Sequence, residues 1–123
     1  MFNIKLGKPE VDCFWYELKK KIDNGIANKY EIEKYKKLGN TFKKLSNNPK
    51  HPGLNSHEIK ILSKRYGTKV FESYIENRKP KAGRVFWIYG PNKEDITIIG
   101  IEPHPEDKTN AYDRITLSRE TNR

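Results

Sequence analysis

The segment from 69 to 105 constrains the fold of this chain more than any other. It contains three runs rich in β-branched and aromatic residues, at 69–77, 84–89 and 96–101. Two short stretches rich in Pro, Gly, Asn and charged residues separate the runs. Consecutive antiparallel strands joined by hairpins have this pattern. We therefore expect a three-stranded meander on which the rest of the chain packs.

The residues before the meander have a different periodicity. Residues 2–6 alternate between apolar and polar, which predicts a short first strand. Apolar residues then recur at spacings of three and four from 11 to 22, Phe14 among them, and again from about 30 to 45. Each series forms an apolar stripe on one face of an α-helix. Gly39 marks a place where the second helix could break.

This order of elements predicts an α+β fold with the helices on one side of an antiparallel sheet. The chain has 123 residues and 34% hydrophobic content, which suits one domain with one modest core. We expect residues 1–123 to form a single domain, in which 1–46 supplies a strand and the helical part. Residues 54–118 are expected to supply a sheet of three to four antiparallel strands, with 111–118 as a possible final edge strand. The turn-rich residues 46–61 are read as a connection.

The composition narrows the class of partner. The chain has 25 Lys and Arg against 16 Asp and Glu, a formal net charge of +9, which favours nucleic acid or an acidic protein; a solvated basic surface without a partner is the alternative. Cys13 is the only cysteine, so no internal disulfide can form. No apolar run approaches about 18 residues and no signal-peptide core follows Met1, so we expect a cytoplasmic protein without a membrane partner.

The ends of the predicted strands carry the residues that could do chemistry. Arg84 begins the middle strand, and His104 follows the last one. Strict alternation from 96 to 104 places Glu102 and His104 on one face. The hairpin loop adds three cations that could hold nucleic acid or could serve solubility alone: Arg78, Lys79 and Lys81.

RNA cleavage is a reaction that needs only such groups. The 2′-hydroxyl attacks its own 3′-phosphate if one group takes its proton, another protonates the leaving 5′-oxygen, and a cation stabilises the phosphoryl oxygens. His104, Arg84 and Tyr112 are of the right types, and His57 and His51 are further candidates. An isolated histidine is also common as a surface or structural residue.

Other chemistries have less support in the sequence. The three histidines lie far apart, with no i, i+4 pair and no dense carboxylate cluster, so we predict no catalytic metal. A phosphate-binding Gly-rich loop and a nucleophile elbow are both missing, so we predict no nucleotide cofactor and no Ser-His-Asp catalysis.

Several motifs between 45 and 112 occur in an order that is itself informative. They are Pro49-Lys-His-Pro-Gly-Leu54, His57, the strand at 71–77, Gly83-Arg-Val-Phe-Trp87 and Ile98-Ile-Gly-Ile-Glu-Pro-His104. Taken together, this series resembles the RelE/ParE superfamily of toxins from type II toxin–antitoxin systems. The N-terminal half is similar to that superfamily only in its layout of strand, helix and helix.

The resemblance implies roles for four residues. Gly83-Arg-Val-Phe-Trp87 looks like the strand whose arginine contacts the scissile phosphate in RNase members, which would give Arg84 that role. His104 takes the place of a histidine implicated in catalysis, and Tyr112 that of a tyrosine implicated in catalysis or base stacking. His57 is similar to a basic residue or histidine found before the second strand of the meander. This chain departs from RNase members at Glu72, where a basic residue is common.

The resemblance also implies a function and partners. It implies a metal-independent endoribonuclease that cuts mRNA, commonly at the ribosome, and that is held inactive by a cognate antitoxin protein. The ParE branch instead poisons DNA gyrase and does not need the arginine and histidine. A third possibility is a non-catalytic RNA- or protein-binding domain whose charge alone supplies attraction. The oligomeric state is left open.

Overall fold

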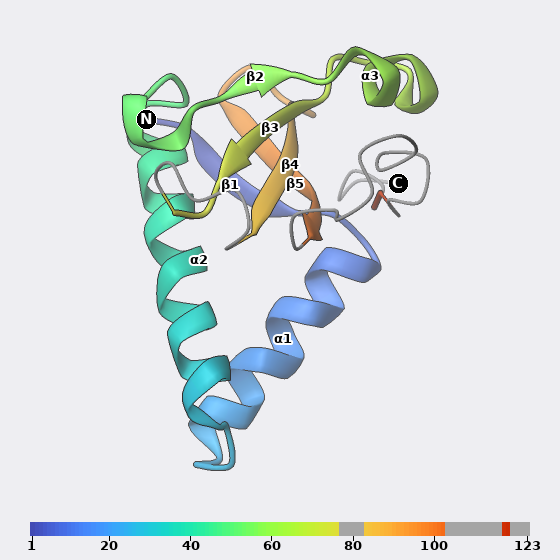
Figure 1. The fold of residues 1–123 in the computed structure, drawn as a ribbon. Coiled ribbons are helices and arrows are strands. Elements are labelled where there is room, and N and C mark those ends of the chain that lie inside the picture. The colour runs from blue at the N-terminus through green and yellow to red at the C-terminus, as the bar shows by residue number, and fades with distance from the viewer. Residues whose placement is uncertain (77–82, 103–116, 119–123) are drawn as a thin grey trace.

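A computed structural model describes residues 1–76, 83–102 and 117–118. It is α+β, as predicted (Figure 1). In chain order, the elements are β1 (Asn3–Leu6), α1 (Glu10–Asp23), α2 (Lys29–Asn47), the 3₁₀ turn η1 (Pro52–Leu54), β2 (His57–Glu58), α3 (Lys60–Tyr66), β3 (Phe71–Tyr74), β4 (Arg84–Tyr89) and β5 (Asp95–Glu102).

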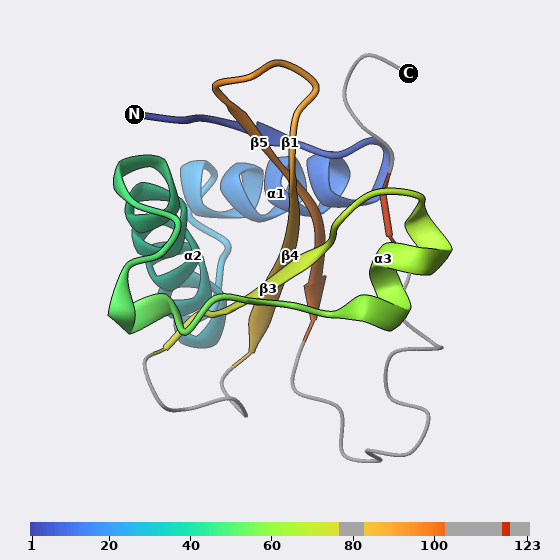
Figure 2. The same cartoon turned by 90° about the horizontal axis from the view of Figure 1, so that it is seen from above.

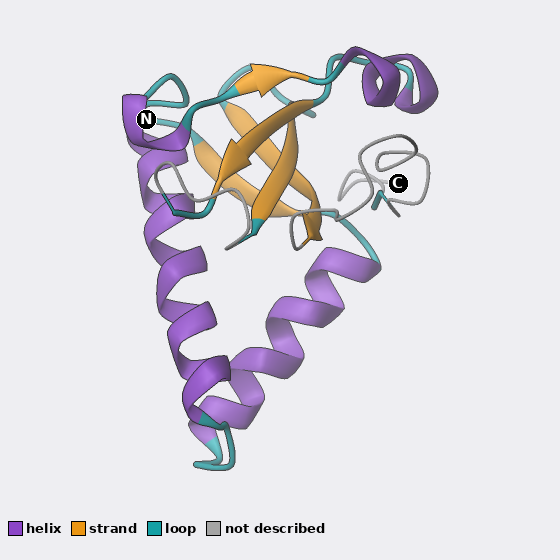
Figure 3. Cartoon of the chain, viewed as in Figure 1, coloured by secondary structure: helices purple, strands orange, loops and turns teal. Residues whose placement is uncertain are grey.

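The described residues form a mixed sheet of five strands, in the order β1-β5-β4-β3-β2 (Figure 3). Strands β2 to β5 pair antiparallel, whereas β1 pairs parallel with β5, with Asn3 opposite Asp95. The expectation of three to four purely antiparallel strands is therefore wrong. Parallel neighbours need a long crossover connection, which here runs from residue 7 to residue 94, and a local pattern contains no information about such a distant pairing.

The two long helices form a V whose closed end lies at residues 24–28 and whose open end meets the sheet (Figure 1). Both helices begin and end close to the predicted bounds. Asn28 caps α2 through a capping box: its side chain accepts a hydrogen bond from the Glu31 backbone N–H, and the Glu31 carboxylate accepts one from the Asn28 N–H. The helix continues through Gly39 without the break that the sequence allowed.

The connection between the helices and the meander contains a helix that the sequence reading missed. Residues 54–61 were expected to lead directly back to the sheet, but α3 occupies Lys60–Tyr66 and ends at Gly67, whose φ of 98° is in the left-handed region. The helix has only seven residues, and its apolar members, Ile61, Leu62 and Tyr66, are too few for a periodic signal.

Both faces of the sheet are covered. Val85, Trp87 and Ile98 pack with the apolar stripes of α1 and α2 in one cluster. Phe86 and Ile99 pack with α3 and its neighbours in a second cluster, so that the strands lie between α2 and α3 (Figure 2). The two long helices and α3 thus lie on opposite faces of the sheet.

A β-bulge in β5 breaks the alternation that the sequence predicted from 96 to 104. Trp87 pairs with Ile98 and Phe86 pairs with Gly100, which leaves Ile99 as the additional residue. Ile99 belongs to the cluster of Phe86, and Gly100 faces Phe86 as well, whereas Ile101 packs on the opposite cluster. The prediction that even-numbered residues share one face throughout this strand is wrong, because one extra residue reverses the phase.

The possible edge strand at 111–118 lies outside the described residues except for its end. There, Ser118 donates its backbone N–H to the Ile99 carbonyl at 2.7 Å and accepts a hydrogen bond from the Val11 N–H at 3.1 Å on its hydroxyl. Within the described part of the chain, none of the helices has the length and apolar character needed to cross a membrane.

Candidate functional site

The structure describes three of the eight candidate residues: Arg84, His57 and His51, the last of which caps the η1 turn. The other five lie outside the described residues, and their placement stays a prediction: His104, Tyr112, Arg78, Lys79 and Lys81.

Arg84 and His57 meet through a third residue, Glu72. Glu72 Oε1 lies 3.0 Å from His57 Nε2, and its Oε2 accepts a hydrogen bond from Arg84 Nη1. The three residues form a row across three neighbouring strands, β2, β3 and β4. We call them the His57–Glu72–Arg84 group.

Strand pairing explains why these side chains meet. His57 is directly opposite Glu72 in the antiparallel pair of β2 and β3. On the next pair, Arg84 is opposite Tyr74 and therefore diagonal to Glu72, within reach of a long side chain. Phe71 and Val85, the sequence neighbours of Glu72 and Arg84, pack with α1 and α2. Alternation thus directs the group to the opposite face of the sheet.

Burial divides the group into a hidden pair and an accessible ring. Glu72 is 1% exposed and Arg84 is 2% exposed. Their opposite charges compensate each other. A buried charge without such a partner would lower the free energy of unfolding. The Arg84 guanidinium also lies 5.2 Å from the centre of the Phe86 ring. The His57 side chain is 44% exposed, so this ring is the part of the group that a ligand can reach.

The second nitrogen of the His57 ring has a defined neighbour as well. Nδ1 lies 2.9 Å from the backbone carbonyl oxygen of Asn55, a residue in the left-handed conformation with φ of 49°. The edge of the ring faces Tyr74, with the ring centres 6.2 Å apart. Both ring nitrogens therefore face oxygen atoms, one of a carboxylate and one of a carbonyl.

A polar chain on the helix side of the sheet fixes the short strand β2. Trp87 Nε1 donates to Ser73 Oγ at 2.8 Å, and Ser73 Oγ lies 2.6 Å from Ser56 Oγ. Ser56 in turn donates to the Pro49 carbonyl at 2.8 Å. Because Ser56 directly precedes His57, this chain holds the start of β2 against the core while His57 faces the other way.

Sequence reasoning missed Glu72. It treated this glutamate as a departure from RNase members, whereas the structure makes it the link between Arg84 and His57. One signal was available. Glu72 interrupts a run of apolar and aromatic residues that was read as a strand of the core sheet, and a buried carboxylate there needs a cation or several donors.

The predicted contact of Arg84 with a phosphate stays a prediction. In this structure the guanidinium is buried and paired with Glu72, so a phosphate reaching it would compete with the carboxylate. Among the described residues, no group of three or more His, Cys, Asp or Glu side chains is placed to hold a metal ion.

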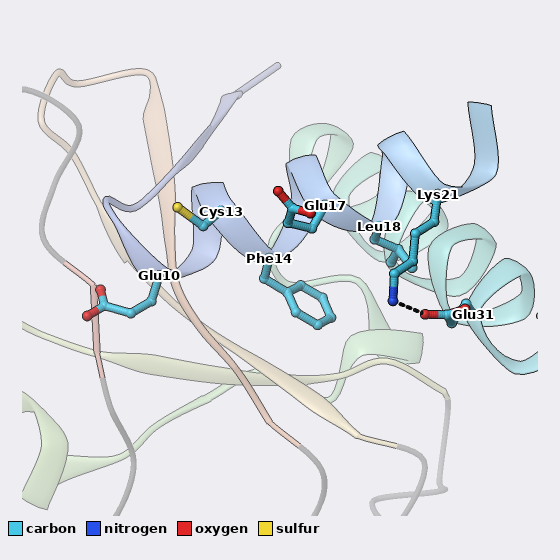
Figure 4. Close-up of a pocket in the computed structure, with 7 residues that line it drawn as sticks. All are labelled: Glu10, Cys13, Phe14, Glu17, Leu18, Lys21 and Glu31. Carbon is cyan, nitrogen blue, oxygen red and sulfur yellow. Dashed lines mark hydrogen bonds and ion pairs between the residues drawn. The ribbon is translucent and has the colours of Figure 1, made fainter. Parts of the chain in front are cut away.

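A concave region away from this group lies along α1 and reaches Glu31 in the first turn of α2 (Figure 4). It is an open groove of about 480 Å³ in which Phe14 and Leu18 supply the apolar surface. Phe14 was expected in the buried stripe but is 38% exposed here. Lys21 donates a hydrogen bond to Glu31 at 2.8 Å across one end, and this contact lowers the pKa of Glu31. No histidine lines the groove among the described residues, and Lys34 Nζ of α2 lies 5.3 Å from the centre of the Phe14 ring.

Comparisons of the sequence and the structure with protein families, with curated proteins and with solved structures found no match.

Proposed function

We propose that this protein is a toxin-type endoribonuclease that cleaves mRNA, at the ribosome, without a metal ion, and that an antitoxin protein neutralises it. The observation that carries the proposal is the His57–Glu72–Arg84 group. It brings a solvent-accessible histidine and an arginine from two separate motifs of the RelE/ParE-like series to one place on the sheet. The net charge of +9 supports a polyanionic substrate.

The proposed chemistry is attack of the 2′-hydroxyl on the adjacent phosphate. The products are a 2′,3′-cyclic phosphate and a 5′-hydroxyl, and the steps to catalyse are two proton transfers and the stabilisation of phosphoryl charge. Arg84 is proposed to stabilise that charge, and histidines to transfer the protons. His104 and Tyr112 belong to this proposal through the resemblance alone.

One observation favours a second candidate, a binding domain without catalysis. Arg84 and Glu72 are both almost fully buried and satisfy each other's charge, as a purely structural ion pair would. In that case the basic surface alone would attract RNA or an acidic protein, and substitution of the histidines would leave the activity unchanged.

The decisive experiment is cleavage of a defined mRNA by the purified protein in excess EDTA, with and without ribosomes. We expect cleavage that yields 2′,3′-cyclic phosphate ends and that falls by about 10² to 10⁴ in His57→Ala or His104→Ala. His51→Ala is the matched control, because this histidine caps the η1 turn and is not part of the group. Cleavage that requires an added metal ion would contradict the proposal.

Expression in bacteria tests the same proposal in the cell. We expect growth arrest with cleaved mRNA, relieved by co-expression of the neighbouring small open reading frame and absent in His104→Ala. Arrest with DNA damage and intact mRNA would indicate a gyrase poison instead. Binding of RNA without cleavage, unchanged in both histidine variants, would favour the non-catalytic domain.

A further inference from the structure

We propose that His57 is the general acid that protonates the leaving 5′-oxygen, and that Glu72 is a positioning residue that holds the ring for this task. This inference rests on the proposed endoribonuclease function and assigns the role of one site residue within it. It starts from the two oxygen neighbours of the imidazole.

The contact at Nδ1 identifies this nitrogen as a donor. Its neighbour, the Asn55 carbonyl oxygen at 2.9 Å, can only accept a hydrogen bond. A bare Nδ1 would place two lone pairs against each other, so the contact assigns a hydrogen to Nδ1. At the opposite edge of the ring, Nε2 faces the Glu72 carboxylate at 3.0 Å. Because a carboxylate oxygen also accepts, the same argument assigns a hydrogen to Nε2, and both N–H groups belong to a side chain that is 44% exposed.

Glu72 is suited to orient the ring because it cannot turn away. Its other oxygen accepts the hydrogen bond from Arg84, and the buried pair has no access to water that could replace either contact. A fixed carboxylate on one ring nitrogen sets the plane of the imidazole and leaves the other nitrogen to react. Arg84 contributes to this arrangement by keeping Glu72 in place.

The proposed step forms one bond to phosphorus and breaks another. The 2′-oxygen forms a bond to phosphorus, and its proton passes to a second histidine that acts as base, the role left for His104 in the proposed function. The bond between phosphorus and the 5′-oxygen breaks, and the proton on His57 Nδ1 moves to that oxygen, which takes the place of the Asn55 carbonyl as hydrogen-bond acceptor. The products are a 2′,3′-cyclic phosphate and a free 5′-hydroxyl, and the ring keeps its other hydrogen, the one on Nε2 that faces the Glu72 carboxylate.

A substrate that needs no acid tests the assignment. In an RNA whose scissile 5′-oxygen is replaced by sulfur, the leaving thiolate departs without protonation. On ordinary RNA we expect His57→Ala to lower the cleavage rate by about 10² to 10⁴ and Glu72→Gln by about 10 to 100. On the sulfur-containing RNA we expect both variants to cleave at nearly the wild-type rate.

Glu76→Gln is the matched control. It removes a carboxylate from the same stretch of chain, but one that pairs with Lys37 of α2 rather than with the group, and we expect unchanged rates on both substrates. Thermal unfolding of each variant shows whether it folds. If Glu72→Gln does not fold, the test relies on His57→Ala alone. We expect this variant to fold, because the His57 side chain is 44% exposed on a short edge strand.

The outcomes separate the two proposals. Absence of cleavage by the wild-type protein, with or without ribosomes, would contradict the endoribonuclease function itself. Wild-type cleavage that His57→Ala leaves intact, or that it lowers equally on both substrates, would overturn only the acid role. Long-range ¹H–¹⁵N spectra give a readout independent of activity: we expect a protonated Nδ1 in the wild type, and a bare Nδ1 would also overturn the inference.

Discussion

At the scale of single residues, the Glu72–Arg84 pair can affect both the stability of the fold and the activity of the protein. These two effects must be measured separately. Two buried charges are stable together because the attraction between them offsets the hydration free energy that each lost on leaving water. Removing one leaves the other buried without compensation, whereas removing both can be nearly neutral if the replacements fill the space. A loss of activity in a single variant could therefore reflect unfolding alone.

Denaturant unfolding of single and double variants measures this coupling. We expect Glu72→Met or Arg84→Met alone to lower the free energy of unfolding by about 3–5 kcal/mol. The double variant is expected to recover most of that loss, because methionine fills comparable volume without a charge. Additive losses in the double variant would contradict a compensated buried pair. His57→Ala is the control, because its side chain is half-exposed and contributes less to stability.

For His57, the sequence indicates a candidate histidine and its place in the chain, but it does not indicate the role of the ring. The sequence identified a histidine before the second strand of the meander as a candidate. It could not specify the neighbours of the two ring nitrogens, because Glu72 is fifteen positions away and the Asn55 carbonyl depends on a left-handed backbone. Those neighbours decide whether the ring presents a proton or a lone pair.

At the scale of elements, the start of α2 shows a local signal that determines structure directly. Asn28 and Glu31 have the spacing of a capping box, and both of its hydrogen bonds form. The first backbone N–H groups of a helix have no partner within the helix, so such a cap contributes stability. The helix that begins here supplies Leu38 and Leu45 to the core under the sheet.

Substitution of asparagine at two positions separates capping from helix propensity. We expect Asn28→Ala to lower the free energy of unfolding by about 1 kcal/mol, because it removes the capping side chain. The same substitution at Asn40, inside α2 and exposed, should be neutral or stabilising by up to about 0.5 kcal/mol, because alanine favours the helix interior. Chemical denaturation measures both. Equal effects at the two positions would contradict the capping role.

The bulge in β5, unlike the cap of α2, has no local signal in the sequence. Residues 96–101 were correctly predicted as a strand, yet the extra residue Ile99 reversed the phase of everything after it. The bulge places Ile99 and Gly100 on the face of Phe86 and returns Ile101 to the opposite cluster. A run of isoleucines is compatible with either phase, so the sequence alone did not fix it.

At the scale of the whole molecule, positive charge is unevenly distributed along the chain. Residues 1–50 contain 12 lysines and six acidic residues, so this half contributes +6 of the net +9. Most of these lysines lie on the two long helices, away from the His57–Glu72–Arg84 group. Long-range attraction of a polyanion and contact at the group are therefore separable properties.

The salt dependence of RNA binding tests the first of these properties. We expect the affinity for an RNA with a 2′-deoxy scissile nucleotide, which cannot be cleaved, to fall as salt rises from about 50 to 200 mM. Each phosphate contact should contribute about −0.7 to the slope of log K against log salt. Fluorescence anisotropy measures this slope. His57→Ala should leave it almost unchanged, and affinity that does not depend on salt would contradict electrostatic attraction.

The sequence by itself determined the local elements: both long helices, the α+β class and the strands at 84–89 and 96–101 all follow from periodicity and turn residues. It also identified Arg84 and His57 as residues of interest. Only the tertiary structure decided that β1 joins β5 in parallel, where the bulge falls, and that Glu72 connects His57 to Arg84. The physical reason is the same in each instance. Periodicity and capping act over a few neighbouring residues, whereas strand partners, register and buried charge pairs depend on segments that meet only after the chain has folded.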